Sequence, residues 1–247
     1  MKKIFTLLML GITLSAAGAN PVLIGRRGCT AGVENSVEAY REAIARGYKM
    51  VEGHVRVTAD SVFVTSHDGK TTRLGGALKV EESTYPQLKA ETYTQLREDS
   101  LTYTGSICTV AEFLEICRDG NATAVLHLKN FPKGTHEGHL DALALLIAKV
   151  YAPEKVLILT SSPEYVEYLM DKHPELPVMF QAENKWAERL EWCKERRLDI
   201  DLEKSLLTPE CVKAYHDAGL KIAVWTVNDP DEAKTLDVDY IITDLLY

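Results

Sequence analysis

The sequence predicts an α/β protein folded as a single (β/α)8 barrel. Three observations support this prediction. Short runs of β-branched and apolar residues recur along the chain, amphipathic helical patterns separate most of them, and eight of the runs are spaced for parallel pairing. Eight parallel strands are the number that closes such a barrel. An open, doubly wound sheet is the alternative arrangement of the same units.

The expected elements follow one another in regular order. The eight strands are expected at residues 22–25, 48–55, 122–128, 155–159, 177–180, 198–201, 221–226 and 240–243. Helical periodicity is found between them at residues 34–46, 110–118, 139–151, 163–172, 186–196, 209–218 and 231–236. In the first of these helices Val37, Tyr40, Ala43 and Ile44 share one face, and Gly47 marks its end.

Two segments depart from this alternation. Residues 62–65 read as an additional strand, but only a few residues separate them from the second strand. A parallel crossover needs a dozen residues or more, so this pair is expected to form a hairpin that turns around Ala59 and Asp60. Residues 69–108 have no firm periodicity and are expected to form a long excursion on one rim.

The first nineteen residues have the three-part build of a secretory signal peptide. Lys2 and Lys3 form a positive start, residues 4–14 form a short apolar run, and Ala17-Gly18-Ala19 is a small-residue cleavage site. A membrane anchor is the alternative, but the run is far shorter than the roughly 20 apolar residues that span a bilayer. We therefore expect one barrel domain over residues 20–247, exported to the periplasm or the cell exterior.

Composition limits the classes of partner. The whole chain has 28 basic and 36 acidic residues. An acidic surface argues against nucleic acid as a partner, and no stable membrane insertion is expected after signal cleavage. The five cysteines match no metal-binding or CxxC spacing, and their odd number leaves at least one free. They are expected to be small buried side chains, with room for one disulfide.

Polar side chains gather where the predicted strands end. In a (β/α)8 barrel the active site is built at the carboxyl ends of the strands. The polar residues at these ends are Arg26, Arg27, Glu52, His54, His67, Asp68, His127, Lys129, Trp225, Thr226, Asn228 and Asp244. Glu52 and His54 are two residues apart and so share one face of a strand. His127 and Lys129 share a face for the same reason. One carboxylate, up to three imidazoles and three cationic side chains are therefore expected on one rim.

These residues also form an ordered set of motifs. Along the chain they read Arg26-Arg27-Gly28, Glu34-Asn35-Ser36, Glu52-Gly53-His54-Val55, Thr58-Ala59-Asp60, His67-Asp68, Arg73, His127-Leu128-Lys129, Trp225-Thr226-Val227-Asn228 and Ile242-Thr243-Asp244. This set resembles the glycerophosphodiester phosphodiesterase family, whose signature runs H-R-G, P-E-N-T, E-x-D-V, T-x-D-G, H-D, E-x-K, W-T-V-N and I-T-D. The resemblance covers nearly all of residues 22–244.

The resemblance implies a metal-dependent phosphoric diester hydrolase that cleaves glycerophosphodiesters to glycerol 3-phosphate and an alcohol. Carried over by position, Arg27 and Lys129 are expected to hold the phosphate. Trp225 is expected to contact the substrate and also to take part in core packing. His67 corresponds to one of the family's two acid–base histidines, and Glu52 to a metal ligand. The substrate is expected to be a small phosphodiester or phosphate ester.

Three positions depart from the family pattern. Arg26 stands at the first catalytic histidine, His54 at the metal aspartate and His127 at the second metal glutamate. Arginine stays protonated, so Arg26 cannot act as a general base. A ligand set of Glu52, His54 and His127 favours Zn²⁺ or Mn²⁺ over Mg²⁺ or Ca²⁺. The three substitutions also make the rim about three charge units more positive than the family pattern, which favours phosphate binding even without metal.

Two functional hypotheses remain. In the first, the protein is a diesterase with an altered metal site, in which His67 exchanges protons and Arg26 stabilises transition-state charge. In the second, it is a catalytically silent relative that binds phosphate esters. A barrel glycosidase is excluded because no two carboxylates face each other at the predicted strand ends.

Overall fold

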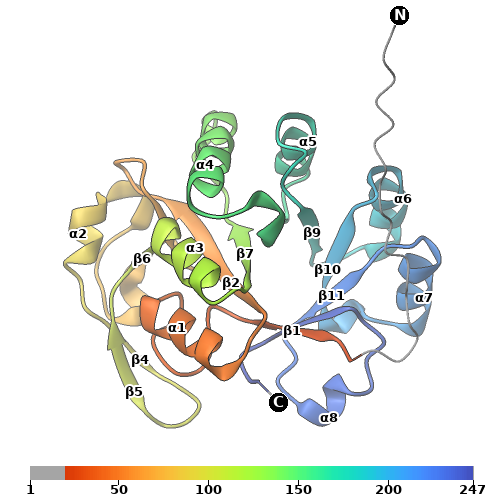
Figure 1. Cartoon of the computed structure of the whole chain (residues 1–247), viewed down its shortest axis with the longest axis horizontal. Coiled ribbons are helices and arrows are strands. Elements are labelled where there is room, and N and C mark those ends of the chain that lie inside the picture. Colours follow the sequence, from red (N-terminus) through yellow and green to blue (C-terminus); the bar gives the residue numbers. More distant parts are fainter. Residues whose placement is uncertain (1–19, 247) are drawn as a thin grey trace, which may run out of the picture.

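Eight parallel strands close into a barrel in the computed structural model, which describes residues 20–246 (Figure 1). They are β1 (Val22–Gly25), β2 (Met50–Val57), β7 (Thr123–Leu128), β8 (Val156–Thr160), β9 (Val178–Ala182), β10 (Asp199–Glu203), β11 (Ile222–Trp225) and β12 (Tyr240–Thr243). Each pairs with the next, and β1 pairs with both β2 and β12. The predicted barrel is confirmed. The predicted signal peptide at residues 1–19 lies outside the described residues.

The period of two along each strand divides apolar side chains between the barrel interior and its helical shell. Interior positions are filled by Ile24, Val125, Leu159, Met179, Ala223 and Ile242. Val51, Val55 and Leu126 point outward into the core under the helices. Because the interior layer carries Val125, the next two positions on that face are His127 and then Lys129, above the apolar layer.

Helices cover the outside of the strands. They are α1 (Val37–Arg46), α3 (Val110–Asp119), α4 (His136–Val150), α5 (Pro163–Lys172), α6 (Trp186–Arg196), α7 (Pro209–Asp217) and α8 (Pro230–Ala233). The predicted start of the first helix at residue 34 is wrong. Asn35 has a φ of 56°, and Ser36 is the N-cap that accepts a hydrogen bond from the backbone N–H of Ala39.

The predicted hairpin joins β2 to β3 (Phe63–Thr65) with Val55 opposite Thr65. Its turn is closed by a hydrogen bond from the Thr58 N–H to the Val62 carbonyl, and Ser61 takes a φ of 62°. The structure thus confirms an antiparallel strand directly after the second strand of the barrel.

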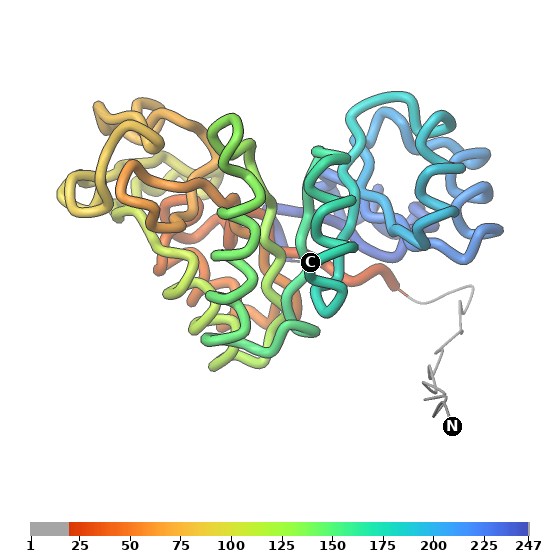
Figure 2. The backbone as a smooth tube through the Cα atoms, turned by 90° about the horizontal axis from the view of Figure 1, so that it is seen from above, coloured from red at the N-terminus to blue at the C-terminus, as the bar shows by residue number. Residues whose placement is uncertain are grey.

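The rim excursion is ordered, although its sequence has no firm periodicity. It contains two 3₁₀ turns, η1 (Thr71–Leu74) and η2 (Val80–Glu82), the short helix α2 (Tyr85–Lys89), the hairpin strands β4 (Tyr93–Leu96) and β5 (Thr102–Gly105), and β6 (Cys108–Thr109). These elements are too short to produce a repeating pattern. They bury Leu74, Val80, Leu88 and Tyr93 in a small core that also contains Val64 of β3. Figure 2 shows the first part of the excursion at one side of the molecule, away from the C-terminal helices.

All five cysteines are buried and free. The described residues therefore do not contain the one disulfide for which the sequence left room. Within residues 20–246 no helix is long and apolar enough to cross a membrane.

Candidate active site

A pocket of about 80 Å³ opens at the carboxyl ends of the barrel strands. It is lined by Arg26, Arg27, Glu52, His54, His67, His127, Lys129, Gln181, Glu183, Trp225 and Ile242. The structure therefore brings the eight residues to which the sequence analysis assigned a role into one pocket. The other four polar residues listed at the strand ends, Asp68, Thr226, Asn228 and Asp244, do not line it. Larger hollows exist elsewhere, such as a groove of about 370 Å³ between α1 and α3, but that groove lies on the outer helical layer, away from this group.

Strands β2 and β7 supply the centre of the pocket. His54 and His127 are register partners, and their ring centroids lie 4.6 Å apart. The backbone N–H of His54 donates to Asn35 Oδ1 at 3.0 Å, which ties the loop before α1 to β2. Gly53 lies between the two functional positions because a Cβ there would come within 2.7 Å of the Tyr40 hydroxyl. These contacts hold the β2 backbone in one place.

Glu52, His54 and His127 form a group that could hold a metal ion. One potential ligand atom of each lies within 4.8 Å of the others, and all three side chains are buried. His127 Nδ1 lies 3.1 Å from Glu52 Oε1, and His54 Nε2 lies 3.7 Å from the same oxygen. Glu52 Oε2 and His54 Nδ1 are buried without a hydrogen-bond partner among the described residues. Unpartnered donor atoms in a buried group of this composition fit a cation with mixed nitrogen and oxygen ligands.

The charge states of this group also suit metal binding. Burial lowers the pKa of His54 well below its usual value, helped by His127 and Lys129. Burial also lowers the pKa of His127, although Glu52 opposes this. For Glu52, burial favours the neutral form, but the hydrogen bond from His127 and the nearby charges of Arg26 and Arg27 leave its pKa lowered. The imidazoles are therefore neutral and the carboxyl is ionised, as metal ligands must be.

His67 is arranged as a proton acceptor. Its Nδ1 lies 2.7 Å from Asp68 Oδ1, and its ring lies 4.8 Å from that of His54. Burial and the charge of Arg27 lower the pKa of His67 to about 4, against the opposing effect of Asp68. Since an ionised carboxylate only accepts hydrogen bonds, the neutral imidazole donates from Nδ1, and the lone pair of Nε2 is left for a substrate proton.

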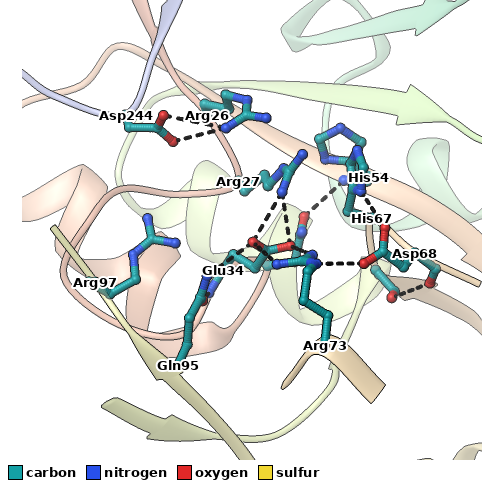
Figure 3. Close-up of polar contacts among 12 residues, drawn as sticks. Arg26, Arg27, Glu34, His54, His67, Asp68, Arg73, Gln95, Arg97 and Asp244 are labelled. Atoms are coloured by element: carbon teal, nitrogen blue, oxygen red, sulfur yellow. Dashed lines mark hydrogen bonds and ion pairs between the residues drawn. The ribbon is translucent and has the colours of Figure 1, made fainter. Parts of the chain in front are cut away.

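The buried carboxylate of Glu34 anchors Arg27. The Arg27 Nη1 group lies 3.1 Å from both oxygens of Glu34, which also accepts hydrogen bonds from Arg73 and Gln95 (Figure 3). Burial alone would raise the pKa of Glu34, but the two arginines lower it to about 2. The sequence analysis placed Glu34 in a family motif without assigning it a role, because its partners come from distant segments.

Arg26 is paired with an acid at the rim. Its Nη1 lies 3.3 Å from Asp244 Oδ2 (Figure 3). Asn228 donates to the same oxygen at 3.0 Å. Arg27 is likewise paired with Glu34. Both arginines of the rim are therefore paired with carboxylates, and the sequence analysis did not identify these carboxylates as their partners.

Lys129 and Trp225 complete opposite walls of the pocket. Burial lowers the pKa of Lys129 to about 8, although Glu52 opposes this, so the ammonium form still predominates at pH 7. The indole Nε1 of Trp225 is buried and has no hydrogen-bond partner among residues 20–246. An unpaired buried donor at a pocket wall is available to an acceptor on a ligand.

Sequence analysis missed a polar pair beneath the pocket. Gln181 Nε2 donates to Asp201 Oδ2 at 2.8 Å, and Asp201 is completely buried. Burial raises the pKa of Asp201 well above its usual value, which favours the neutral carboxyl. The fifth predicted strand, residues 177–180, ended one position before Gln181. The available signal was the period of two, which places Gln181 on the same interior face as Met179.

The sequence matches a known protein family along most of its length. The model of the glycerophosphoryl diester phosphodiesterase family matches residues 16–246. The chain belongs to this family. A Mycobacterium tuberculosis protein named "Probable glycerophosphodiester phosphodiesterase 2" is 26% identical over 232 residues, which cover 85% of this chain and 81% of that protein.

Solved structures share the fold of this family member. A phosphodiesterase from Oleispira antarctica, solved with the product sn-glycerol-3-phosphate, superposes with a TM-score of 0.77 at 21% identity and covers 91% of this chain and 93% of its own. A glycerophosphodiester phosphodiesterase from Thermotoga maritima has a TM-score of 0.72 at 22% identity and covers 92% of this chain and 96% of its own. At these identities the likeness concerns the fold.

The three departures from the family pattern all face this pocket. Arg26, His54 and His127 are pocket-lining side chains, and His54 and His127 belong to the group that could hold a metal. In this member of the glycerophosphoryl diester phosphodiesterase family, the three residues that depart from the family signature therefore lie in the pocket itself.

Proposed function

We propose that the protein hydrolyses glycerophosphodiesters to glycerol 3-phosphate and an alcohol with an altered metal site. The observation that carries this proposal is the convergence of a potential metal group, a neutral histidine and two phosphate-binding cations in one pocket. The bound product in the Oleispira antarctica structure supports a phosphate ester as the ligand.

In this proposal Glu52, His54 and His127 hold the cation, and their ligand types favour Zn²⁺ or Mn²⁺ over Mg²⁺ or Ca²⁺. When bound there, the cation would supply Lewis-acid polarisation of a phosphoryl oxygen and offset charge that develops on it. Arg27 and Lys129 hold the phosphate, with Arg27 contributing the planar guanidinium that suits phosphate oxygens. Trp225 forms the substrate wall, and its indole N–H is the donor that a ligand oxygen can use.

His67 accepts or returns the proton in this reaction. Its Nε2 lone pair is available because Asp68 holds Nδ1–H at 2.7 Å. Arg26 cannot exchange a proton, so we assign to it the stabilisation of transition-state charge. Its contacts with Asp244, at 3.3 and 3.4 Å, use only Nη1 and leave the other guanidinium nitrogens for a phosphate.

A catalytically silent phosphate-ester binder is the second candidate. One observation favours it: the position of the family's first catalytic histidine is occupied by Arg26, whose charge is paired with Asp244. Arg27, Lys129 and Trp225 would still hold a phosphate ester in such a protein. The two candidates therefore share a binding site and differ in turnover.

The deciding experiment measures the metal content of the purified protein together with release of glycerol 3-phosphate from simple glycerophosphodiesters. Hydrolysis that depends on Zn²⁺ or Mn²⁺ and is lost in His67→Gln supports the diesterase. Binding of sn-glycerol 3-phosphate without turnover, by wild type and His67→Gln alike, supports the silent binder. Absence of both binding and turnover contradicts both candidates.

We also propose that the protein is exported, on the basis of the charged start, apolar run and small-residue site within residues 1–19. N-terminal sequencing of the protein recovered outside the cytoplasm tests this. A mature chain that begins at Asn20 is the expected result, and retention of Met1 in all material contradicts it.

A further inference from the structure

One arginine of the rim excursion joins two carboxylates of the site. Arg73, in η1, donates from Nε to Asp68 Oδ2 at 2.6 Å. Its Nη1 donates to Glu34 Oε2 at 2.9 Å, and its Nη2 donates to Glu34 Oε1 (Figure 3). A planar guanidinium can serve both acids at once because its donors form a fixed fork. Arg73 is the most exposed member of this group, with 43% of its side chain accessible, whereas the Glu34 side chain is 3% exposed.

Each of these carboxylates holds a different functional side chain. Glu34 binds Arg27 through two contacts of 3.1 Å, and Asp68 binds His67 Nδ1 at 2.7 Å. Within residues 20–246, no hydrogen bond or ion pair joins Arg73 directly to Arg27 or His67. Its influence on the pocket therefore passes through Glu34 to the phosphate side and through Asp68 to the proton-accepting side.

We call the connection through Glu34 the phosphate arm and the connection through Asp68 the proton arm. The hairpin of the excursion supports only the phosphate arm. Gln95, in β4, accepts the backbone N–H of Glu34 at 2.9 Å and donates to Glu34 Oε2 at 3.2 Å. No hydrogen bond joins Gln95 to Asp68 among the described residues. Arg97, in the loop after β4, donates instead to the backbone carbonyls of Cys29 and Thr30. Among these three residues of the excursion, Arg73 contacts both carboxylates and Gln95 contacts Glu34 alone. Arg97 contacts neither carboxylate.

Charge gives Arg73 a role beyond tethering. Arg27 and Arg73 together balance the carboxylates of Glu34 and Asp68. Without Arg73 the same group carries one net negative charge beside the pocket, and the Glu34 charge is directed at Arg27 alone. Both changes oppose the binding of an anionic phosphate at Arg27, since like charges repel and Arg27 is more fully neutralised.

We propose that Arg73 is a positioning residue that prepares the phosphate-binding Arg27 and the proton-accepting His67 together, so that the excursion of residues 69–108 completes the site. This proposal rests on the proposed function for the role of His67. The phosphate arm stands on geometry and charge, and it applies equally to a silent binder.

Four variants test the proposal: Arg73→Met, Gln95→Met, Asp68→Asn and the matched control Arg97→Met. Affinity for sn-glycerol 3-phosphate is measured by calorimetry, and kcat is measured on a glycerophosphodiester. Gln95→Met is expected to weaken affinity and leave kcat close to wild type. Asp68→Asn is expected to lower kcat without weakening affinity. Arg73→Met is expected to change both, each by about tenfold or more, as is usual for residues that orient a binding group.

The lysine variant separates charge from geometry. Arg73→Lys keeps the positive charge, but its ammonium cannot span Glu34 and Asp68 as the fork does. We expect Arg73→Lys to recover most of the phosphate affinity and little of kcat. A variant that only loosened the fold would lower the phosphate affinity and kcat together, in proportion to its loss of melting temperature. Arg97→Met shows the size of that effect.

Two results overturn the proposal. One is an Arg73→Met protein whose affinity and kcat match those of Arg97→Met. The other is a Gln95→Met protein that loses as much kcat as Asp68→Asn does. If wild type cleaves no diester, the hydrolase proposal fails, and the affinities of the Arg73, Gln95 and Arg97 variants still decide the phosphate arm.

Discussion

Arg26 is the residue that most separates the two candidate functions. Its guanidinium remains charged at any working pH, and it lies 3.3 Å from Asp244 in the pocket rim. Asn228 donates to the same carboxylate, so Asp244 has two partners at the rim. The carboxylate was visible in the sequence as part of the closing motif, but its pairing with Arg26 was not.

We predict that Arg26→His weakens binding of sn-glycerol 3-phosphate, because it removes a permanent positive charge. If the missing proton relay limits catalysis, the same variant raises diesterase activity, by up to the roughly 10²–10⁴ that a positioned acid or base contributes. The gain is expected to be clearest together with His54→Asp and His127→Glu. Calorimetry and product release measure the two effects. Brisk wild-type turnover that Arg26→His reduces would show that Arg26 has a catalytic role of its own.

The metal group gives a second prediction at the scale of single residues. We expect Zn²⁺ or Mn²⁺ to raise the melting temperature more than Mg²⁺ does, since a ligand that binds only the native state stabilises it, by about 2.7 kcal/mol at a hundredfold excess over Kd. His54→Ala and His127→Ala are each expected to abolish the shift. Lys79→Ala, on the exposed excursion surface, is a matched control. An equal shift in all three variants would place the metal elsewhere.

At the scale of elements, the loop between β1 and α1 depends on the rim excursion. Glu34 in this loop is buried, yet Arg27 and Arg73 lower its pKa to about 2 from an ordinary 4.5. A group whose folded pKa is depressed contributes stability above its unfolded pKa and loses it as the pH falls through the folded pKa. The contact between loop and excursion is therefore expected to weaken between about pH 4.5 and pH 2.

We predict that Glu34→Gln lowers the free energy of unfolding at pH 7 by on the order of 3 kcal/mol, the value of this pKa depression. The difference from wild type should shrink as the pH falls toward 2, because the wild-type carboxyl then takes up a proton. Urea unfolding of both proteins at pH 7, 4 and 3 measures this. A difference that stays constant over that range would mean that the charge of Glu34 does not hold the loop.

At the scale of the whole molecule, the barrel interior changes from apolar to polar along its axis. Ile24, Val125 and Met179 fill the lower layer, and the pocket residues lie above it. Asp201 lies between these zones, fully buried, with its Oδ1 unpartnered among the described residues. An ionisable group in this position costs stability whenever the unfolded chain would ionise it.

We predict that Asp201→Asn raises the free energy of unfolding at pH 7. Burial raises the folded pKa of Asp201, so wild type loses stability as the pH rises above the unfolded value for aspartate. The amide variant has no such loss, and its advantage should vanish near pH 3. Urea unfolding at both pH values provides the measurement. An Asp201→Asn protein less stable than wild type at pH 7 would indicate that the carboxyl is ionised and paired in the folded protein.

The sequence by itself determined the order of the barrel strands and the face on which Glu52, His54, His127 and Lys129 lie. Both follow from short-range rules. Strand and helix periods are local properties of the chain, side chains two apart on a strand share a face, and parallel strands in a barrel end at one rim. Any chain with this pattern brings those four residues together, so their placement needed no knowledge of the loops.

Only the tertiary structure decided which charges pair. Arg26 and Asp244 are 218 residues apart, and Arg73 and Glu34 are 39 apart. These contacts depend on the paths of the β1–α1 loop and the rim excursion, whose short elements carry no periodic signal. The same holds for the bond between Gln181 and Asp201, which required the register of β9 against β10. Local pattern fixes where a side chain points, whereas its partner depends on how distant segments pack.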